Sequence, residues 1–144
     1  MAESIRAPLS AVNFLRFDDE GAAYLQGTRC AACAAVAPGV RLVCNACGAR
    51  SGMQSIRLSE HGAISTYTIV HRSFPGVKTP FIAVIVDLEG GGALKGSLLG
   101  VSEDPREIRY GMRVKVVYRD TGQTSPDGRP FYSYYFESQG APDG

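Results

Sequence analysis

The sequence predicts a mainly β fold made of a small cysteine-rich module and a compact barrel. From Met53 onward, runs of alternating apolar and polar residues, rich in Val, Ile, Thr and Tyr, are separated by turn residues. This period of two is typical of short β-strands. The 17 glycines spread over turn positions, and the chain has no tryptophan. Because all four cysteines lie between Cys30 and Cys47, ahead of these runs, we expect a metal-binding module before the barrel.

The cysteines form two Cys-x-x-Cys pairs, Cys30 with Cys33 and Cys44 with Cys47. One such turn aims two sulfurs at one point, and two turns complete the tetrahedral four-thiolate shell that zinc accepts. Gly48 follows the second pair and can take a positive φ, which turns backbone N–H groups toward the sulfurs. We predict one structural zinc ion per chain, bound by all four cysteines, in a site with no open position for water.

Other chemistries of these cysteines stay open at this point. Iron suits the same tetrahedral thiolate site as zinc. Two disulfides would need an oxidising compartment, and the N-terminus shows no charged and then apolar leader with a small-residue cleavage site. A redox-active pair would need a thioredoxin-like βαβ context, whereas the residues that follow indicate strands. Zinc is therefore the preferred interpretation.

Charge and hydropathy limit the classes of function. The 15 basic and 14 acidic residues leave a formal charge of +1, which lacks the basic excess of a dedicated nucleic-acid binder. The apolar run of residues 81–86 ends at Asp87, and no apolar run approaches the roughly twenty residues that span a bilayer. We therefore expect a soluble, cytoplasmic protein with no membrane partner, and the composition does not favour nucleic acid.

The N-terminal extension, residues 1–22, shows no sustained period in its first half, so we expect that half to be flexible or to lie on a partner. The extended runs 13–17 and 22–29 flank an acidic turn, which predicts a β-hairpin that leads into the first cysteine pair. A short helix over residues 11–17 is the alternative.

The metal module is expected to span residues 23–52. Between the cysteine pairs, residues 36–39 carry the Pro-Gly signal of a turn, and residues 40–43 form a short apolar run typical of a strand. This layout places the two cysteine turns on facing loops, as in a zinc ribbon.

Residues 53–138 are expected to form the barrel, with 139–144 as a flexible tail. The expected strands are residues 54–59, continued or paired after a bend by 63–72, and then 81–87, 93–99, 113–118 and 131–137. The run 81–87 is apolar on both faces, which predicts a central strand covered on two sides.

A short helix is expected between the third and fourth barrel strands. Asp104 can cap it, Pro105 suits the first helical position and Glu107 can reach back to the cap N–H. Gly111 ends this helix, and residues 120–130 form a polar excursion rich in Gly and Pro. Five strands with one helix in this place follow the order of a partly open OB-fold barrel.

Six short motifs resemble those of a known family. They are Gln26-Gly-Thr-Arg-Cys30-x-x-Cys33, Cys44-x-x-Cys47-Gly48, Gly62-x-Ile-x-x-Tyr67-Thr-x-Val70, Pro80-Phe81, Leu94-x-Gly96 and Gly111-Met-Arg-Val114. Together they resemble the acyl-CoA-associated proteins in which a rubredoxin-like zinc ribbon precedes an OB-fold domain. This family has long been catalogued as a domain of unknown function and is commonly encoded beside thiolases. Two departures are Ala34, where the family has glycine, and a predicted N-terminal hairpin, where it has helices.

The resemblance implies an accessory subunit of a thiolase-type complex that acts on an acyl-CoA. The aromatic-rich last strand is consistent with an aromatic or bulky 3-oxoacyl-CoA. The subunit would support assembly or binding of the CoA thioester, with two copies on a thiolase dimer. The residues agree with a non-catalytic role, because thiolysis needs a nucleophilic cysteine and a base. All four cysteines are assigned to the metal, and neither His61 nor His71 has neighbours that suggest a triad. We expect no catalysis by this chain alone.

Two loops are softer candidates for a ligand site. Arg72, Phe74 and Lys78 place two cations and an aromatic ring in the loop 71–80, which suits a CoA phosphate, an adenine or a partner carboxylate. A solvated loop is the alternative. Residues 89–96 invite comparison with a phosphate-binding loop but lack its spacing, so a hairpin turn is preferred there.

The last strand carries aromatic residues on both faces. If one face fills the barrel, the other must be covered by the ribbon, a partner or a ligand. We predict a partner interface at Tyr132, Tyr134 and Phe136, since aromatic residues anchor interface cores. The alternative function, single-stranded nucleic-acid binding by a zinc-ribbon/OB-fold protein, would use the same three rings to stack bases.

Overall fold

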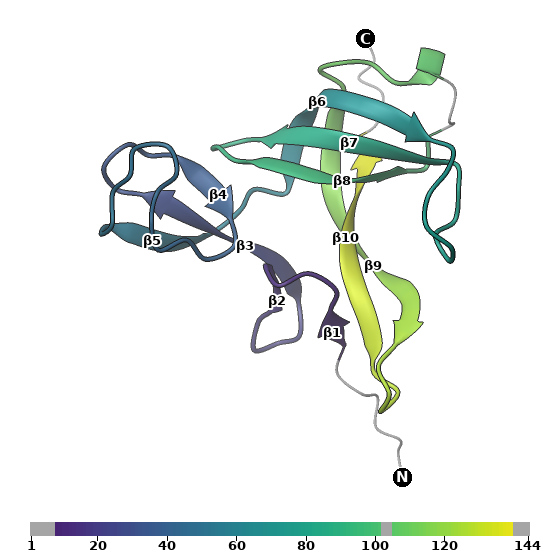
Figure 1. Cartoon of the computed structure of the whole chain (residues 1–144), viewed down its shortest axis with the longest axis horizontal. Helices are drawn as coiled ribbons and strands as arrows, with labels where there is room; N and C mark the ends of the chain where they lie inside the picture. The colour runs from purple at the N-terminus through teal and green to yellow at the C-terminus, as the bar shows by residue number, and fades with distance from the viewer. Residues whose placement is uncertain (1–7, 102–104, 140–144) are drawn as a thin grey trace.

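The structure is a computed structural model that describes residues 8–101 and 105–139. Within these ranges the chain forms ten β-strands and one short 3-10 helix, so the predicted mainly β fold is confirmed (Figure 1). The expected helix cap Asp104, the first seven residues and residues 140–144 lie outside the described residues. No helix in the described part of the chain is long and apolar enough to cross a membrane.

The N-terminal sheet contains four strands around the long β3. They are β2 (Leu15–Phe17), β3 (Ala23–Cys30), β4 (Val36–Pro38) and β5 (Met53–Arg57). Strands β2 and β3 pair antiparallel, which confirms the predicted hairpin in place of a short helix. The Asp18 carboxylate fixes the connecting turn, since it accepts the N–H groups of Glu20 and Ala22, each at 2.9 Å.

Between the cysteine pairs, the expected turn and strand exchange places. Val36–Pro38 is strand β4 and pairs with residues Gly27 to Arg29 of β3, whereas residues 40–43 have no regular secondary structure. Pro38 fits because an edge strand tolerates a residue without an N–H donor. The expectation of a turn at 36–39 and a strand at 40–43 is therefore wrong.

Strand β5 also pairs with β3 and thus belongs to the sheet of the metal module, whereas we expected this segment to begin the barrel. A short connection, residues 58–60, joins β5 of the metal module to the first strand of the barrel (Figure 1). The exact partition of the chain into domains stays a prediction.

The barrel consists of β6 (His61–Val70), β7 (Phe81–Leu88), β8 (Ala93–Leu99), β9 (Arg113–Thr124) and β10 (Pro130–Ser138). Strands β6, β7 and β8 form an antiparallel meander, β10 runs parallel to β8, and β9 pairs with both β10 and β6. This order is that of an OB fold. The β8–β10 seam joins only two residue pairs, so the barrel is not fully closed.

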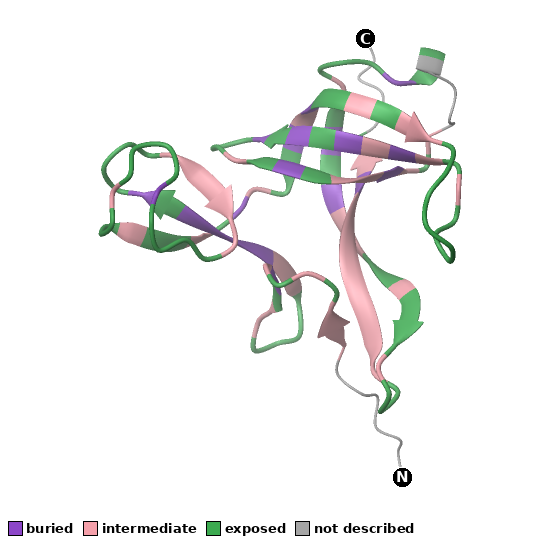
Figure 2. Cartoon of the chain, viewed as in Figure 1, coloured by how far each residue is buried: buried purple, intermediate pink, exposed green. Residues whose placement is uncertain are grey.

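The core lies inside the barrel and extends along β3 (Figure 2). In β7, the side chains of Ile82, Val84 and Val86 are buried, whereas Ile85 is 37% exposed. The strand is central in its sheet, but only one of its faces is covered by the core, which corrects the expectation of two covered faces. Antiparallel sheets commonly leave one face in contact with water.

The last two strands differ from the expectation in length. Strand β9 continues to Thr124, so the first five residues of the predicted polar excursion are strand, and the turn is confined to residues 125–129. The β9–β10 hairpin extends beyond the barrel, where β1 (Leu9–Ser10) adds parallel to β10 (Figure 1). The predicted short helix is a single 3-10 turn, Pro105–Glu107.

Candidate metal centre and interaction surfaces

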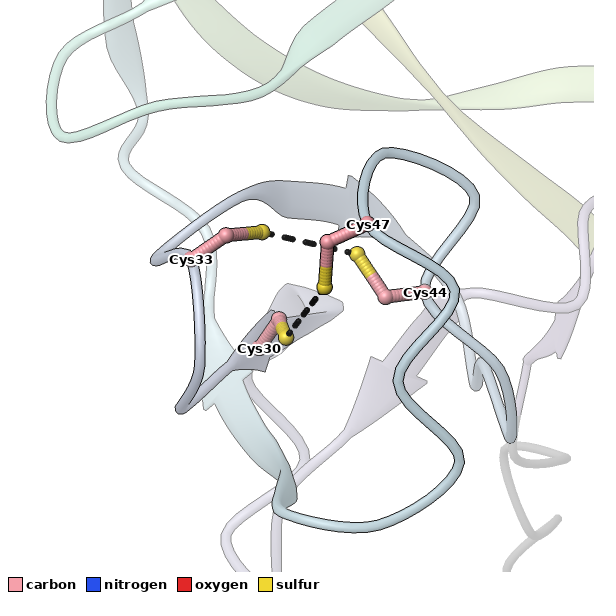
Figure 3. Close-up of side chains that lie close together, drawn as sticks. All are labelled: Cys30, Cys33, Cys44 and Cys47. Carbon is pink, nitrogen blue, oxygen red and sulfur yellow. Dashed lines mark hydrogen bonds between the residues drawn. The ribbon is translucent and has the colours of Figure 1, made fainter.

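The four cysteine side chains point toward one another (Figure 3). The Cys30 Sγ lies 3.8 Å from the Cys47 Sγ, and the Cys33 Sγ lies 3.6 Å from the Cys44 Sγ. All four sulfurs lie within 4.8 Å of one another. A tetrahedral site with metal–sulfur distances of about 2.3 Å has sulfur–sulfur edges of about 3.8 Å, so the cluster has the size that zinc needs. A disulfide requires sulfurs about 2.05 Å apart.

The two cysteine turns repeat one backbone pattern. The Ala34 N–H donates to the Cys30 carbonyl at 2.8 Å, and the Gly48 N–H donates to the Cys44 carbonyl at 2.7 Å. Ala34 has a φ of 68° and Gly48 a φ of 81°, so both occupy the left-handed region. Alanine therefore fills the position of the expected glycine without changing the turn, although a Cβ in this conformation costs free energy.

Backbone N–H groups also act on the sulfurs. The Ala46 N–H lies 3.4 Å from the Cys44 Sγ. The N–H groups of Cys47 and Ala46 lower the pKa of the Cys44 thiol, which favours the thiolate, the form that binds metal. Cys30 and Cys44 are buried, whereas Cys33 and Cys47 are exposed. One cysteine of each pair therefore lies in the protein and the other faces solvent.

The loop 71–80 does not bring its three candidate ligand residues together. Lys78 lines a cleft of about 620 Å³ between this loop, the end of β8 and the β9–β10 hairpin. Arg72 and Phe74 are exposed and do not line the cleft, and Phe74 is 81% exposed. Arg119, Asp120 and Tyr135 supply polar groups on the opposite wall. The assignment of Arg72, Phe74 and Lys78 to CoA stays a prediction.

The aromatic residues of β10 are largely covered by the chain itself. Phe136 is fully buried in the barrel core, so its side chain is not free to bind a partner or to stack a base, which corrects its place in the predicted interface. The Tyr134 ring lies 5.6 Å from that of Phe14, and the Tyr132 ring lies 6.5 Å from that of Phe17, between ring centroids. The partner role of Tyr132 and Tyr134 stays a prediction.

Sequence reasoning missed this cover from the N-terminal segment. Phe14 and Phe17 lie in a short run that predicts a hairpin, but the run does not indicate the surface against which the hairpin packs. The signal for it in the sequence is the last strand itself, because a strand with two apolar faces needs cover on both. The sequence leaves open whether the ribbon, a partner or a ligand covers the second face.

The remaining candidate groups lie apart from the cysteine cluster. His61 begins β6 and His71 follows its last residue, and both are exposed. The glycine-rich segment after β7 is a hairpin turn in which the Leu88 N–H donates to the Gly92 carbonyl at 2.9 Å, as preferred from the sequence. A Cβ at Gly91 would lie 3.0 Å from the Val36 side chain, so this turn packs against β4 of the metal module.

A cysteine cluster of zinc-ribbon geometry followed by an OB fold defines a class of two-module β proteins. Comparison with known proteins agrees with this class. The family model described as the ChsH2 C-terminal OB-fold domain matches residues 55–119. A DUF35 domain-containing scaffold protein of Methanocaldococcus jannaschii is 30% identical over 116 residues, which cover 78% of this chain and 80% of that protein. The chain belongs to this DUF35 family.

Two further matches extend the comparison. A scaffold protein of the same description from Methanothermobacter thermautotrophicus is 27% identical over 115 residues, covering 78% of this chain and 85% of that protein. Among solved structures, one described as an Ltp2-ChsH2(DUF35) aldolase superposes with a TM-score of 0.56 and 25% identity. That match covers 76% of this chain and 84% of the other.

Proposed function

We propose that this chain is a non-catalytic scaffold subunit of a thiolase- or aldolase-type complex. The observation that carries the proposal is the similarity to a scaffold protein over most of this chain and most of that protein. The similar solved structure, described as an Ltp2-ChsH2(DUF35) aldolase, adds support. The fold supports it, because a small rigid module joined to a barrel offers two separate surfaces.

The cysteine cluster fits one structural zinc ion. Cys30, Cys33, Cys44 and Cys47 would hold it, and the ion would cross-link the end of β3 to the loop between β4 and β5. With four thiolates in the shell there is no open position for water, so the metal would stabilise the module and take no part in the reaction of the partner.

We further propose that the complex acts on an acyl-CoA and that the partner supplies the catalytic cysteine. The place on this chain that supports contact with the CoA is the cleft beside Lys78. Lys78 lies in this cleft beside the apolar Leu98 and Ile82, whereas Arg119 is paired with Glu137 at 3.0 Å. A cation next to an apolar lining suits an amphipathic chain with an anionic end.

The test is purification of the tagged full-length chain from its own cells, followed by native mass spectrometry and metal analysis. We expect one zinc per chain and a stoichiometric thiolase-like partner, with two copies of each in the complex. With free CoA supplied, the purified complex should then break the C2–C3 bond of a 3-oxoacyl-CoA and release acetyl-CoA and the shortened acyl-CoA.

Two outcomes would contradict the proposal. If the zinc-loaded protein purified without any enzyme partner, the metal assignment would stand but the scaffold role would be contradicted. A partner that is fully active and assembled after removal of this chain would show that the scaffold is not required.

A further inference from the structure

Seven large apolar side chains of the described residues are exposed. Three of them lie in one segment of four residues, which we name the ribbon loop, residues 40–43. Val40 is 63% exposed, Leu42 is 78% exposed and Val43 is 48% exposed. Single exposed aliphatic residues are normal on protein surfaces, but contiguous ones mark interaction sites. The ribbon loop lies in the metal module, at the opposite end of the molecule from the loop between β6 and β7 (Figure 1).

The ribbon loop is held in place at both ends. The hydroxyl of Thr28, a residue that is 5% exposed, donates to the Gly39 carbonyl at 2.6 Å and accepts the Arg41 N–H at 3.2 Å. The Gly39 N–H donates to the Gln26 carbonyl at 2.8 Å, and the loop ends at Cys44 of the cysteine cluster. A surface that is already ordered loses little conformational entropy on binding. The aliphatic side chains are therefore presented on a rigid support.

The charged side chains of the metal module next to the ribbon loop are arginines. Residues 21–59 contain four arginines and no Asp, Glu or Lys. Arg29, Arg41 and Arg50 are exposed, and within the described part of the chain no carboxylate pairs with them. Arg57 interacts with the Asp18 carboxylate, which leaves Arg29, Arg41 and Arg50. If four thiolates and one Zn²⁺ leave a charge of −2 in the module, one of these three positive charges remains uncompensated. The complementary surface is therefore apolar at its centre and acidic at its rim.

We propose that the ribbon loop docks this chain onto its enzyme partner, by inserting Leu42 and its aliphatic neighbours into an apolar depression bordered by Asp and Glu side chains. This inference rests on the proposed scaffold function and assigns it a surface. A second copy of this chain is a poorer occupant, because a two-fold contact would bring the same arginines together. Nucleic acid would use the arginines but leave the aliphatic side chains in contact with water.

The test uses the zinc-loaded full-length chain and the enzyme that copurifies with the wild-type protein, separated from the complex by mild salt. Binding is measured at two salt concentrations for Leu42→Ser and Arg41→Glu. The matched controls are Tyr110→Ser and Arg109→Glu, two adjacent exposed residues in the connection between the 3-10 turn and β9. Zinc content and melting temperature verify that each variant is folded.

We expect Leu42→Ser to weaken binding at least about tenfold, as at the centre of an interface. Arg41→Glu should slow association at low salt and reduce the salt dependence. Both controls should bind like the wild type. Wild-type affinity for Leu42→Ser and Arg41→Glu would overturn the docking surface while the scaffold function stands. Absence of any partner with the wild-type chain would overturn both. If the wild-type chain bound an oligonucleotide and only Arg41→Glu lost that binding, the occupant of the ribbon loop would be nucleic acid and not a protein.

Discussion

Ala34 and Gly48 occupy equivalent positions in the two cysteine turns, with φ values of 68° and 81°. An L-residue in the left-handed region costs about 1–2 kcal/mol, and glycine does not. Part of this gain is offset by the larger entropy of glycine in the unfolded chain, about 0.4–1 kcal/mol. We therefore expect Ala34→Gly to stabilise the zinc-loaded protein by about 0.5–1 kcal/mol, measured from the midpoint of urea unfolding.

Gly48→Ala is the matched control for this prediction. A Cβ at Gly48 would meet no heavy atom within 4 Å, so only the backbone conformation is affected, and we expect the protein to lose about 1 kcal/mol of stability. If Ala34→Gly lowered the midpoint, the turn conformation described here for the first cysteine pair would be wrong.

A second prediction concerns the metal ligands. Because binding of a structural zinc is largely folding free energy, Cys30→Ser should remove the metal and unfold the N-terminal module. Cys33→Ser, at an exposed ligand position, should retain more structure because a water can reach the vacant position. Metal analysis and the loss of β-sheet circular dichroism on chelation measure both effects. Full zinc content in Cys30→Ser would contradict the four-cysteine site.

Residue by residue, the sequence reveals what local spacing determines. Two Cys-x-x-Cys pairs are enough to predict the cluster, since each turn is built from adjacent residues. The burial of Phe136 could not be predicted in the same way, because the side of a strand that faces the core depends on its pairing register. Here Phe136 lies opposite Val116 of β9 and Leu98 of β8, two buried residues that are distant in sequence.

At the scale of elements, the N-terminal hairpin is part of the folded core. Leu15 on β2 is 1% exposed and belongs to the same apolar cluster as the barrel residues. We expect Leu15→Ala to destabilise the protein by about 2–5 kcal/mol, the range for removal of a buried leucine side chain. Thermal or urea unfolding measures this change. The neighbouring Arg16→Ala is the control, since Arg16 is exposed and should change stability by less than about 0.5 kcal/mol.

Equal stability of Leu15→Ala and Arg16→Ala would show that the segment does not pack as described. If the segment lay only on a partner, both substitutions would be neutral in the isolated chain and would affect assembly instead.

Two glycines of the family-like motifs have a packing role that the sequence could not show. A Cβ at Gly62 of β6 would lie 2.4 Å from the Asp87 carbonyl oxygen of β7, and one at Gly96 of β8 would lie 2.8 Å from the Phe136 ring. Both distances are shorter than a van der Waals contact, so only glycine fits without movement of a neighbour. The motifs could be recognised from the sequence, but the close approach of the strands depends on the sheet itself.

The extent of β9 was mispredicted for a similar reason. Residues 120–124 are polar and include Gly122, which is typical of a loop. They remain extended because β10 provides a partner strand up to Thr124, so tertiary pairing overrides the local preference.

At the scale of the whole molecule, a small polar cluster connects the two modules. The Tyr118 hydroxyl on β9 donates to the Glu60 carboxylate, in the connection between β5 and β6, at 2.7 Å. On the other side of that connection, the Arg57 guanidinium lies 4.0 Å from the centroid of the Tyr24 ring of β3. The cluster ties the metal module and the barrel to the segment that joins them, and its residues are too far apart in sequence to be predicted together.

This cluster leads to a prediction for alkaline pH. Burial and the Glu60 carboxylate raise the pKa of Tyr118 above its ordinary value, because a tyrosinate there would be desolvated and would face a like charge. In the unfolded chain Tyr118 ionises near pH 10. A group with a raised pKa contributes stability that is present below its unfolded pKa and is lost as the pH rises toward the folded pKa. We therefore expect the stability of the wild-type protein to fall as the pH rises above about 10.

Tyr118→Phe removes this titration while keeping the ring. At neutral pH the variant should be less stable by about 0.5–1.5 kcal/mol, the usual contribution of one hydrogen bond. Above pH 10 its stability should fall less steeply than that of the wild type, so the two curves converge. Urea unfolding of the zinc-loaded proteins between pH 8 and pH 11 measures the difference, with the exposed Tyr110→Phe as the control that should follow the wild-type slope. Parallel curves for Tyr118→Phe and the wild type would mean that the contact between Glu60 and Tyr118 does not hold the modules together in solution.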